Sequence, residues 1–481
     1  MRKAGVLLPI ASLPSPYGIG DFGQEAYIWV DKLKNMGMKI WQLLPLNPLG
    51  YGNSPYQPYS SCAGEWLYIS LEKLQEQGLI TSTISSFKPN KTKIDYEGVR
   101  KHKEKYLKEA FSNFVPDVDY EKFIKEQWVK EYSVFVSLKN LNNQRPWNEW
   151  PKEEQDWIHN QEKGLGVPKE EVEYQMFLQY MFYVQWMELK VYANSKGIEV
   201  MGDLPIYVGI DSLDVWANQD HFLLDEEGRP TFIAGVPPDY FSEFGQRWGN
   251  PIYNWEVVRA NGFKFWINRL EANKNLFDII RIDHFRAFDT YWKIPVSCPT
   301  AVEGEWVEAP GYELFDTIFK ELPDINIVAE DLGDLRKEVL ELRDHYKLKG
   351  MYITQFRFDE PENREEEIEN MIIYTGTHDN QTIKGWYSSQ GFRRKRAIKK
   401  YFAKVGYKYR KVAHAFVHYT LMSKAELAIL PIQDLINLGD EGRINTPGTV
   451  GSPNWEWKLV NFKEVDAVIP IINKMIKNSN R

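Results

Sequence analysis

Short apolar runs recur along the whole chain, and longer stretches with helical periodicity separate them. We predict strands from eight of these runs, at residues 5–8, 39–44, 198–201, 279–283, 326–330, 350–356, 371–375 and 428–430. Apolar positions spaced by three and four residues predict helices, at 24–36, 96–113, 119–132, 171–195, 262–275 and 335–345. Eight strands that alternate with helices are typical of an α/β fold of the (β/α)8 TIM barrel type.

The spacing of these elements predicts one barrel over residues 1–481 with two insertions. The first insertion, at about 47–170, combines a turn-rich aromatic loop with Lys- and Glu-rich helical patches. The second, at about 205–260, is rich in Gly, Pro and aromatic residues, and we expect it to form loops around a groove. The chain after residue 435 leaves little room for a separate C-terminal β-sandwich domain.

Three of the predicted strands lead directly into a carboxylate. Asp283 ends the run at 279–283, Glu330 ends the run at 326–330, and Asp379 follows the run at 371–375. The separations of 47 and 49 residues each leave room for a strand, a helix and loops. Because functional residues of such barrels lie at the C-terminal ends of the strands, we expect the three acids to meet on one rim.

Arg281 lies two residues before Asp283 on the same predicted strand. Residues i and i+2 of a strand share a face, so the guanidinium can lie beside the carboxylate. It would favour the ionised form and lower the pKa of Asp283, which suits a nucleophile. From this segment alone, an Arg–Asp pair that only closes a loop is about equally plausible.

Composition narrows the class of protein. The net charge of −8 leaves no basic surface that would bind nucleic acid, so we expect no nucleic-acid partner. Aromatic residues make up 14% of the chain. Core packing accounts for most of these aromatic residues, but Trp and Tyr also suit stacking on sugar rings. Two cysteines, Cys62 and Cys298, provide neither a disulfide framework nor a zinc-like spacing. We expect a cytoplasmic protein without a metal or another cofactor.

The N-terminal apolar run is short, contains Pro9 and continues without a cleavage site, so it does not predict a signal peptide. No stretch approaches the ~20 apolar residues that span a bilayer. We therefore expect no membrane partner. The sequence leaves the choice between a monomer and a homo-oligomer open.

Sequence blocks in a fixed order identify a family. They lie at 12–15, 18–21, 54–56, 202–205, 234–250, 281–286, 329–333, 376–380, 443–448 and 454–455. In these blocks the chain resembles the amylomaltases, bacterial 4-α-glucanotransferases also called disproportionating enzymes, within the α-amylase superfamily. The resemblance runs from Gly5 to Trp457 and is interrupted mainly by the predicted helical insertion.

The resemblance implies roles for the three acids. Asp283 matches the nucleophile of the family, Glu330 the general acid/base, and Asp379 the acid that binds and distorts the sugar at the cleavage point. In a retaining mechanism the first two lie ~5–5.5 Å apart. The positions that match groove or sugar contacts of the family are Tyr56, Asp203, Asp239, Trp248, Arg281, His284, His378 and Asn380.

Three functions remain to be weighed. In transfer, the hydroxyl of an acceptor sugar captures a covalent glucosyl intermediate, and the acceptor is another α-1,4-glucan such as a maltooligosaccharide, or glucose. Water could capture this intermediate instead, which is hydrolysis, or the chain could be a glycan-binding relative without catalysis. The three acids argue against the last. A possible lid at 210–255 and the lack of room for a β-sandwich domain favour transfer, although the family resemblance carries most of that interpretation.

Overall fold

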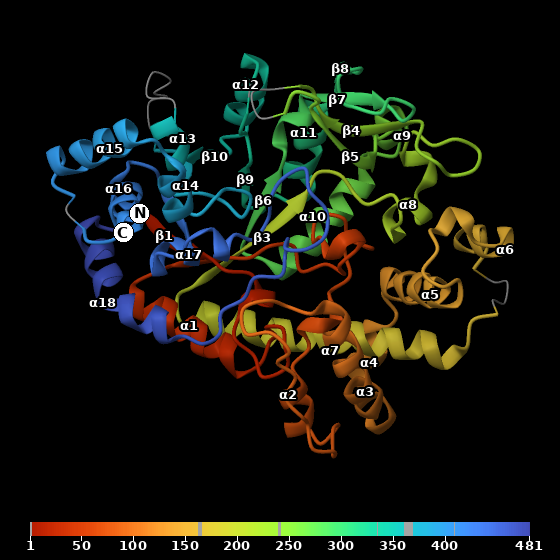
Figure 1. The fold of residues 1–481 in the computed structure, drawn as a ribbon. Helices are drawn as coiled ribbons and strands as arrows, with labels where there is room; N and C mark the ends of the chain where they lie inside the picture. Colours follow the sequence, from red (N-terminus) through yellow and green to blue (C-terminus); the bar gives the residue numbers. More distant parts are fainter. Residues whose placement is uncertain (1, 162–165, 239–241, 334, 360–368, 408) are drawn as a thin grey trace.

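The computed structural model describes residues 2–161, 166–238, 242–333, 335–359, 369–407 and 409–481. Its centre is a parallel sheet of eight strands with the order β10-β11-β12-β1-β2-β3-β6-β9. A bridge between Val328 and Lys349 joins the two end strands, so the sheet closes into a barrel (Figure 1). The strands are β1 (Lys3–Leu7), β2 (Ile40–Gln42), β3 (Glu199–Pro205), β6 (Ile279–Asp283), β9 (Ile327–Ala329), β10 (Gly350–Ile353), β11 (Met371–Tyr374) and β12 (Leu427–Pro431). The predicted TIM barrel is confirmed.

The barrel strands are buried on both faces, as their apolar sequences predict. Gly5 on β1 meets a neighbour so closely that a Cβ there would lie 2.6 Å from the Ile40 side chain. Helix α1 (Gln24–Met36) covers the first crossover and ends at Gly37, whose φ of 85° is left-handed. Helices α10 (Lys264–Leu276), α11 (Gly311–Glu321) and α12 (Lys337–His345) cover later crossovers.

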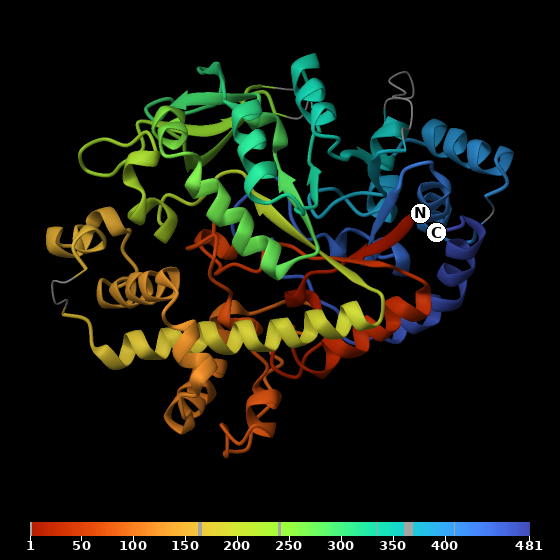
Figure 2. The same cartoon turned by 180° about the vertical axis from the view of Figure 1, so that it is seen from behind.

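A helical region separates β2 from β3. Its helices are α2 (Leu71–Glu76), α3 (Tyr96–Asn113), α4 (Val118–Phe123), α5 (Gln127–Leu141), α6 (Lys152–Gln155) and α7 (Lys169–Ser195). The prediction of one helix at 119–132 is wrong, because the chain turns between Phe123 and Gln127 and forms two helices. The long helix α7 runs along the outside of the barrel beside α1 and packs against α5 of the outer helices (Figure 2).

A second sheet stands beside the barrel where loops were predicted. It is antiparallel with the order β5-β4-β7-β8, built from β4 (Phe232–Val236), β5 (Gln246–Pro251), β7 (Thr290–Pro295) and β8 (Glu305–Glu308). The loop prediction for 205–260 is therefore wrong in part, since β4, β5, α8 (Leu213–Ala217) and α9 (Trp255–Ala260) lie in that range. Gly235, Gly249 and Pro251 interrupt the alternation that would have indicated the strands.

The last third of the chain corrects the sixth predicted strand. β10 ends at Ile353, and the residues that follow form α13 (Thr354–Asp359), because a short alternation such as Thr-Gln-Phe-Arg-Phe does not distinguish strand from helix. The remaining helices are α14 (Ile383–Ser389), α15 (Phe392–Lys404), α16 (Val412–Met422), α17 (Ile432–Ile436) and α18 (Lys463–Asn478). The two chain ends meet (Figure 1), where the Arg481 guanidinium donates to the Lys3 carbonyl at 3.1 Å.

Across the described ranges, no helix is both long and apolar enough to cross a membrane.

A buried ammonium joins α3 to the barrel. Lys103 has no exposed surface, and its Nζ donates to the carbonyls of Leu67 and Ile69 at 2.6 Å and to Asp21 at 3.4 Å. We predict that Lys103→Met lowers the free energy of unfolding by about 3–5 kcal/mol, because it leaves a buried carboxylate without its cation.

Urea denaturation measures this change. The matched control is Lys101→Met on the same helix, which removes only an exposed pair with Glu97 and should alter stability little. Equal losses in the two variants would contradict the prediction.

Candidate active site

Asp283 and Glu330 leave neighbouring strands side by side. Asp283 is the last residue of β6, and Glu330 directly follows β9. The two strands are paired with Ile282 opposite Ala329, so the acids emerge at the same level of the rim. The Glu330 backbone N–H donates to the Ile282 carbonyl at 3.0 Å. The structure thus brings these two predicted site residues together.

Arg281 bridges two carboxylates inside the barrel. Its Nη1 donates to both carboxylate oxygens of Asp203 at 2.7 Å, and its Nη2 lies 2.9 Å from Asp283 Oδ1. β3 and β6 place Asp203 and Arg281 opposite each other. The Asp203 side chain has no exposed surface, whereas 30% of the Asp283 side chain is exposed. Asp203 is therefore buried and holds Arg281, and its predicted contact with the sugar stays a prediction.

Burial changes the expectation for the pKa of Asp283. Desolvation raises this pKa above its ordinary value, and Arg281 is the strongest influence that lowers it. The prediction that Arg281 lowers the pKa of Asp283 is right for the effect of the guanidinium but wrong for the net direction. The reason is that a strand end inside a barrel rim removes more water from the carboxylate than the sequence pattern suggests.

Two backbone N–H groups hold the carboxylate of Glu330. Oε2 accepts from the His284 N–H at 2.7 Å, and Oε1 accepts from the Leu332 N–H at 3.0 Å. His284 makes its contact from a left-handed backbone conformation with φ of 59°. Burial and the negative charge of Asp283 raise the pKa of Glu330 to about 8. Glu330 is therefore protonated at neutral pH while it lies beside Asp283.

His284 and Trp248 form one side of the site. Their ring centroids are 4.7 Å apart in an edge-to-face arrangement, and Trp248 comes from β5 of the second sheet. Burial, with the charge of Arg286, lowers the pKa of His284 to about 3, so its ring is neutral. The second sheet thus contributes an aromatic residue directly beside His284, the residue that follows Asp283 and β6.

Tyr56, His378 and Trp455 form a second aromatic side of the site. The Tyr56 hydroxyl donates to Asp203 Oδ2 at 2.7 Å, and its ring stacks on His378 with centroids 5.0 Å apart. The Trp455 ring packs against both, at 5.6 Å from Tyr56 and 5.9 Å from His378. Tyr56 therefore links this aromatic group to the Asp203–Arg281–Asp283 chain.

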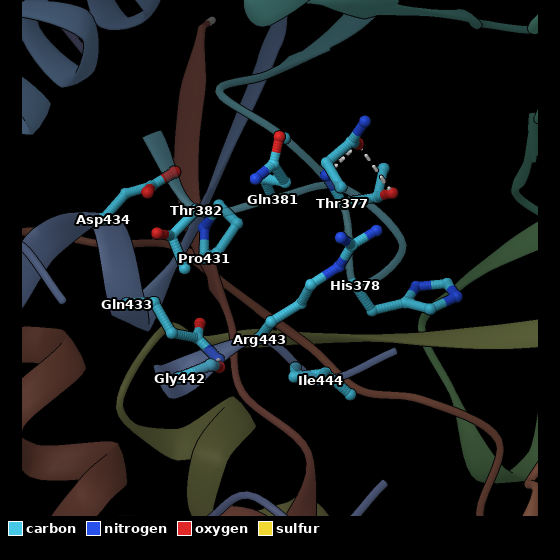
Figure 3. Close-up of a pocket in the computed structure, with 12 residues that line it drawn as sticks. Thr377, His378, Gln381, Thr382, Pro431, Gln433, Asp434, Gly442, Arg443 and Ile444 are labelled. Atoms are coloured by element: carbon cyan, nitrogen blue, oxygen red, sulfur yellow. Dashed lines mark hydrogen bonds between the residues drawn. The ribbon is translucent and has the colours of Figure 1, made fainter. Parts of the chain in front are cut away.

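Asp379 lies in the loop between β11 and α14. Its Oδ1 accepts from Asn445 Nδ2 at 2.7 Å and lies 3.4 Å from His378 Nε2, while its backbone carbonyl accepts from Arg443 Nη2 at 2.7 Å. Its side chain is 42% exposed. The loop surrounds a small pocket whose lining includes His378 and Arg443 (Figure 3).

Asn380 closes the turn of this loop, and its predicted contact with the sugar stays a prediction. Its Oδ1 accepts from the Thr377 N–H at 2.8 Å and from the Thr377 hydroxyl at 3.0 Å, so this oxygen closes the loop turn. Asp239, the remaining predicted groove residue, lies outside the described residues.

Sequence reasoning assigned no role to Asn445, Arg443 or Trp455. The motif blocks at 443–448 and 454–455 were the available signal, but nothing in their local pattern indicates that they reach Asp379 and Tyr56. Arg443 and Asn445 lie 64 and 66 residues after Asp379 in the sequence, so no local pattern could show these contacts.

Comparison with known proteins agrees with this geometry. A family model described as 4-alpha-glucanotransferase matches residues 8–463. A 4-alpha-glucanotransferase of Thermus thermophilus is 44% identical, with 95% of each chain covered. One of Streptococcus pneumoniae is 41% identical, covering 97% of this chain and 95% of the relative.

Solved structures agree as well. An amylomaltase from Streptococcus agalactiae in complex with acarbose superposes with a TM-score of 0.93 at 35% identity, and both chains are covered completely. An amylomaltase from Corynebacterium glutamicum has a TM-score of 0.77 at 17% identity, which supports the fold. The predicted resemblance is confirmed, and the chain belongs to the 4-alpha-glucanotransferase family of enzymes.

Proposed function

We propose that this 4-α-glucanotransferase works by a retaining mechanism with a covalent glycosyl-enzyme intermediate. Asp283 attacks the anomeric carbon of an α-1,4-glucan while Glu330 protonates the departing glycosidic oxygen. Glu330 then removes the proton from the 4-hydroxyl of the acceptor glucan, which displaces Asp283. The observation that carries this proposal is the contact of Glu330 with the backbone of His284, the residue after Asp283, at 2.7 Å.

The charges of the two acids support these roles. Burial and the negative charge of Asp283 raise the pKa of Glu330 to about 8. Arg281 lies against Asp283 directly. The pair therefore loses its first proton from Asp283, which gives an ionised nucleophile beside a protonated acid.

We assign the sugar at the cleavage point to the space between the two aromatic sides. Asp379 binds its hydroxyls, and Tyr56, His378, His284 and Trp248 provide flat or hydrogen-bonding walls. Arg281 and Asp203 act from below by fixing Asp283. The second sheet brings Trp248 against His284, the residue after Asp283. This sheet would limit the access of water to the intermediate, which favours capture by a sugar hydroxyl.

Removal of the nucleophile tests this assignment. We predict that Asp283→Asn lowers kcat by at least about 10³-fold, because no group remains to form the covalent bond, while maltooligosaccharide binding by calorimetry is retained. Asp316→Asn, at an exposed position of α11, is the control and should keep full activity. Substantial turnover by Asp283→Asn would remove Asp283 from the mechanism.

The pKa of Glu330 predicts a basic limb in the pH profile. Glu330 must be protonated to assist departure of the leaving group, so kcat/KM for maltooligosaccharides should fall about tenfold per pH unit above about pH 8. With an α-maltosyl fluoride donor, whose leaving group needs no proton, this limb should flatten. The same basic limb with both donors would contradict the assigned acid.

A further inference from the structure

The loop that carries His378 and Asp379 is fastened at both ends by one side chain. Asp434 Oδ2 accepts from the Thr375 hydroxyl at 2.5 Å, and Asp434 Oδ1 accepts from the Ile383 N–H at 2.8 Å. Thr375 directly follows β11, and Ile383 is the first residue of α14. The two donors thus flank the whole loop, and Asp379 lies midway between them.

Gln433, the residue before Asp434 on α17, holds the segment 442–445, which also contacts Asp379. Gln433 Nε2 donates to the Gly442 carbonyl at 3.0 Å, directly before Arg443 and close to Asn445, which both bind Asp379. Gln433, Asp434, Gly442 and Arg443 line the same small pocket (Figure 3). Two consecutive residues of one short helix therefore fix both segments that meet at Asp379.

Asp434 is an unusual residue for a purely structural contact. Only 1% of it is exposed, and no lysine, arginine or histidine in the described part of the chain forms an ion pair with it. Burial raises its pKa to about 6, and the hydrogen bonds from Thr375 and Ile383 oppose this change. A buried carboxylate without a cation is costly, so the two contacts that it makes have to stabilise the ionised form.

We propose that Asp434 is a positioning residue for the transfer reaction, which acts through Asp379 by fixing both ends of its loop. Gln433 completes this arrangement by fixing the segment that binds Asp379 from the other side. The inference rests on the role proposed above for Asp379. Asp434 itself lies beneath the loop and touches no substrate.

The replacement Asp434→Asn keeps the shape of the side chain but puts an NH2 group opposite one of the two donors. A shift of about 1 Å in a reacting group can cost about 10²-fold in rate. We predict that Asp434→Asn lowers kcat 10- to 100-fold on maltotriose with KM changed less than about threefold. Since most of the groove is untouched, substrate affinity should persist.

A smaller change tests the same contact if Asp434→Asn does not fold. Thr375→Val removes only the hydroxyl that donates to Asp434, and Thr375→Ser keeps it. We predict that Thr375→Val lowers kcat and that Thr375→Ser restores most of it. Equal kcat values for these two variants would overturn the inference.

A double-mutant cycle separates positioning from general stability. Each rate is measured with α-maltosyl fluoride as donor and maltose as acceptor, which keeps slow variants measurable. If Asp434 acts through Asp379, then Asp434→Asn should change kcat less than about twofold in an Asp379→Asn background. An equal loss in both backgrounds would refute the inference.

The matched control is Asp278→Asn at the other end of the barrel. Asp278 Oδ2 accepts from the Val200 N–H at 2.7 Å and from Asn194 Nδ2 at 2.8 Å. The replacement therefore disturbs two similar hydrogen bonds, together with an ion pair to Lys190 at 3.5 Å. It should leave kcat unchanged whatever it does to Tm. Unaltered kcat in Asp379→Asn alone would instead contradict the proposed function, so the two failures are distinguishable.

Discussion

The site depends on one buried guanidinium. Arg281 lies inside the barrel between Asp203 and Asp283 and contacts both. Without it, two desolvated carboxylates would lie on adjacent strands with like charges, and one of them would take up a proton. The parallel pairing of β3 with β6 sets Asp203 opposite Arg281. The register of the barrel therefore places the guanidinium beside Asp283, the proposed nucleophile.

The remaining parts of the site extend this chain outward. Tyr56 joins Asp203 to the stacked rings of His378 and Trp455. The Glu330 carboxylate accepts a hydrogen bond from the backbone N–H of His284, the residue after Asp283. The His284 ring contacts Trp248 of the second sheet. Segments from both insertions and from the C-terminal part of the chain therefore converge on two adjacent strand ends. This convergence brings the proposed nucleophile, the proposed general acid and the aromatic side chains to one rim.

The sequence was sufficient for what local pattern determines. Apolar runs that end in Asp283 and Glu330 indicated both the strands and the rim, because the periodicity of a buried strand is visible in a few residues. Two strands of the antiparallel sheet, β4 and β5, escaped detection because Gly235 and Pro251 interrupt their pattern. The roles of Asn445 and Trp455 were equally invisible, since their contacts depend on how distant segments fold back. The net direction of the pKa shift of Asp283 depends on how deeply the carboxylate is buried, which no local pattern supplies. The division into one domain with two insertions stays a prediction.

The most direct test of the proposed transfer reaction is whether a sugar hydroxyl or water captures the glycosyl-enzyme intermediate. Purified protein incubated with maltotriose alone, with all products resolved by chromatography over time, shows which acceptor captures the glycosyl group. We predict glucose together with a ladder of maltooligosaccharides longer than maltotriose, because a sugar hydroxyl reaches the intermediate before water. Maltose and glucose with nothing longer, together with a steady rise in reducing ends, would contradict it and indicate hydrolysis.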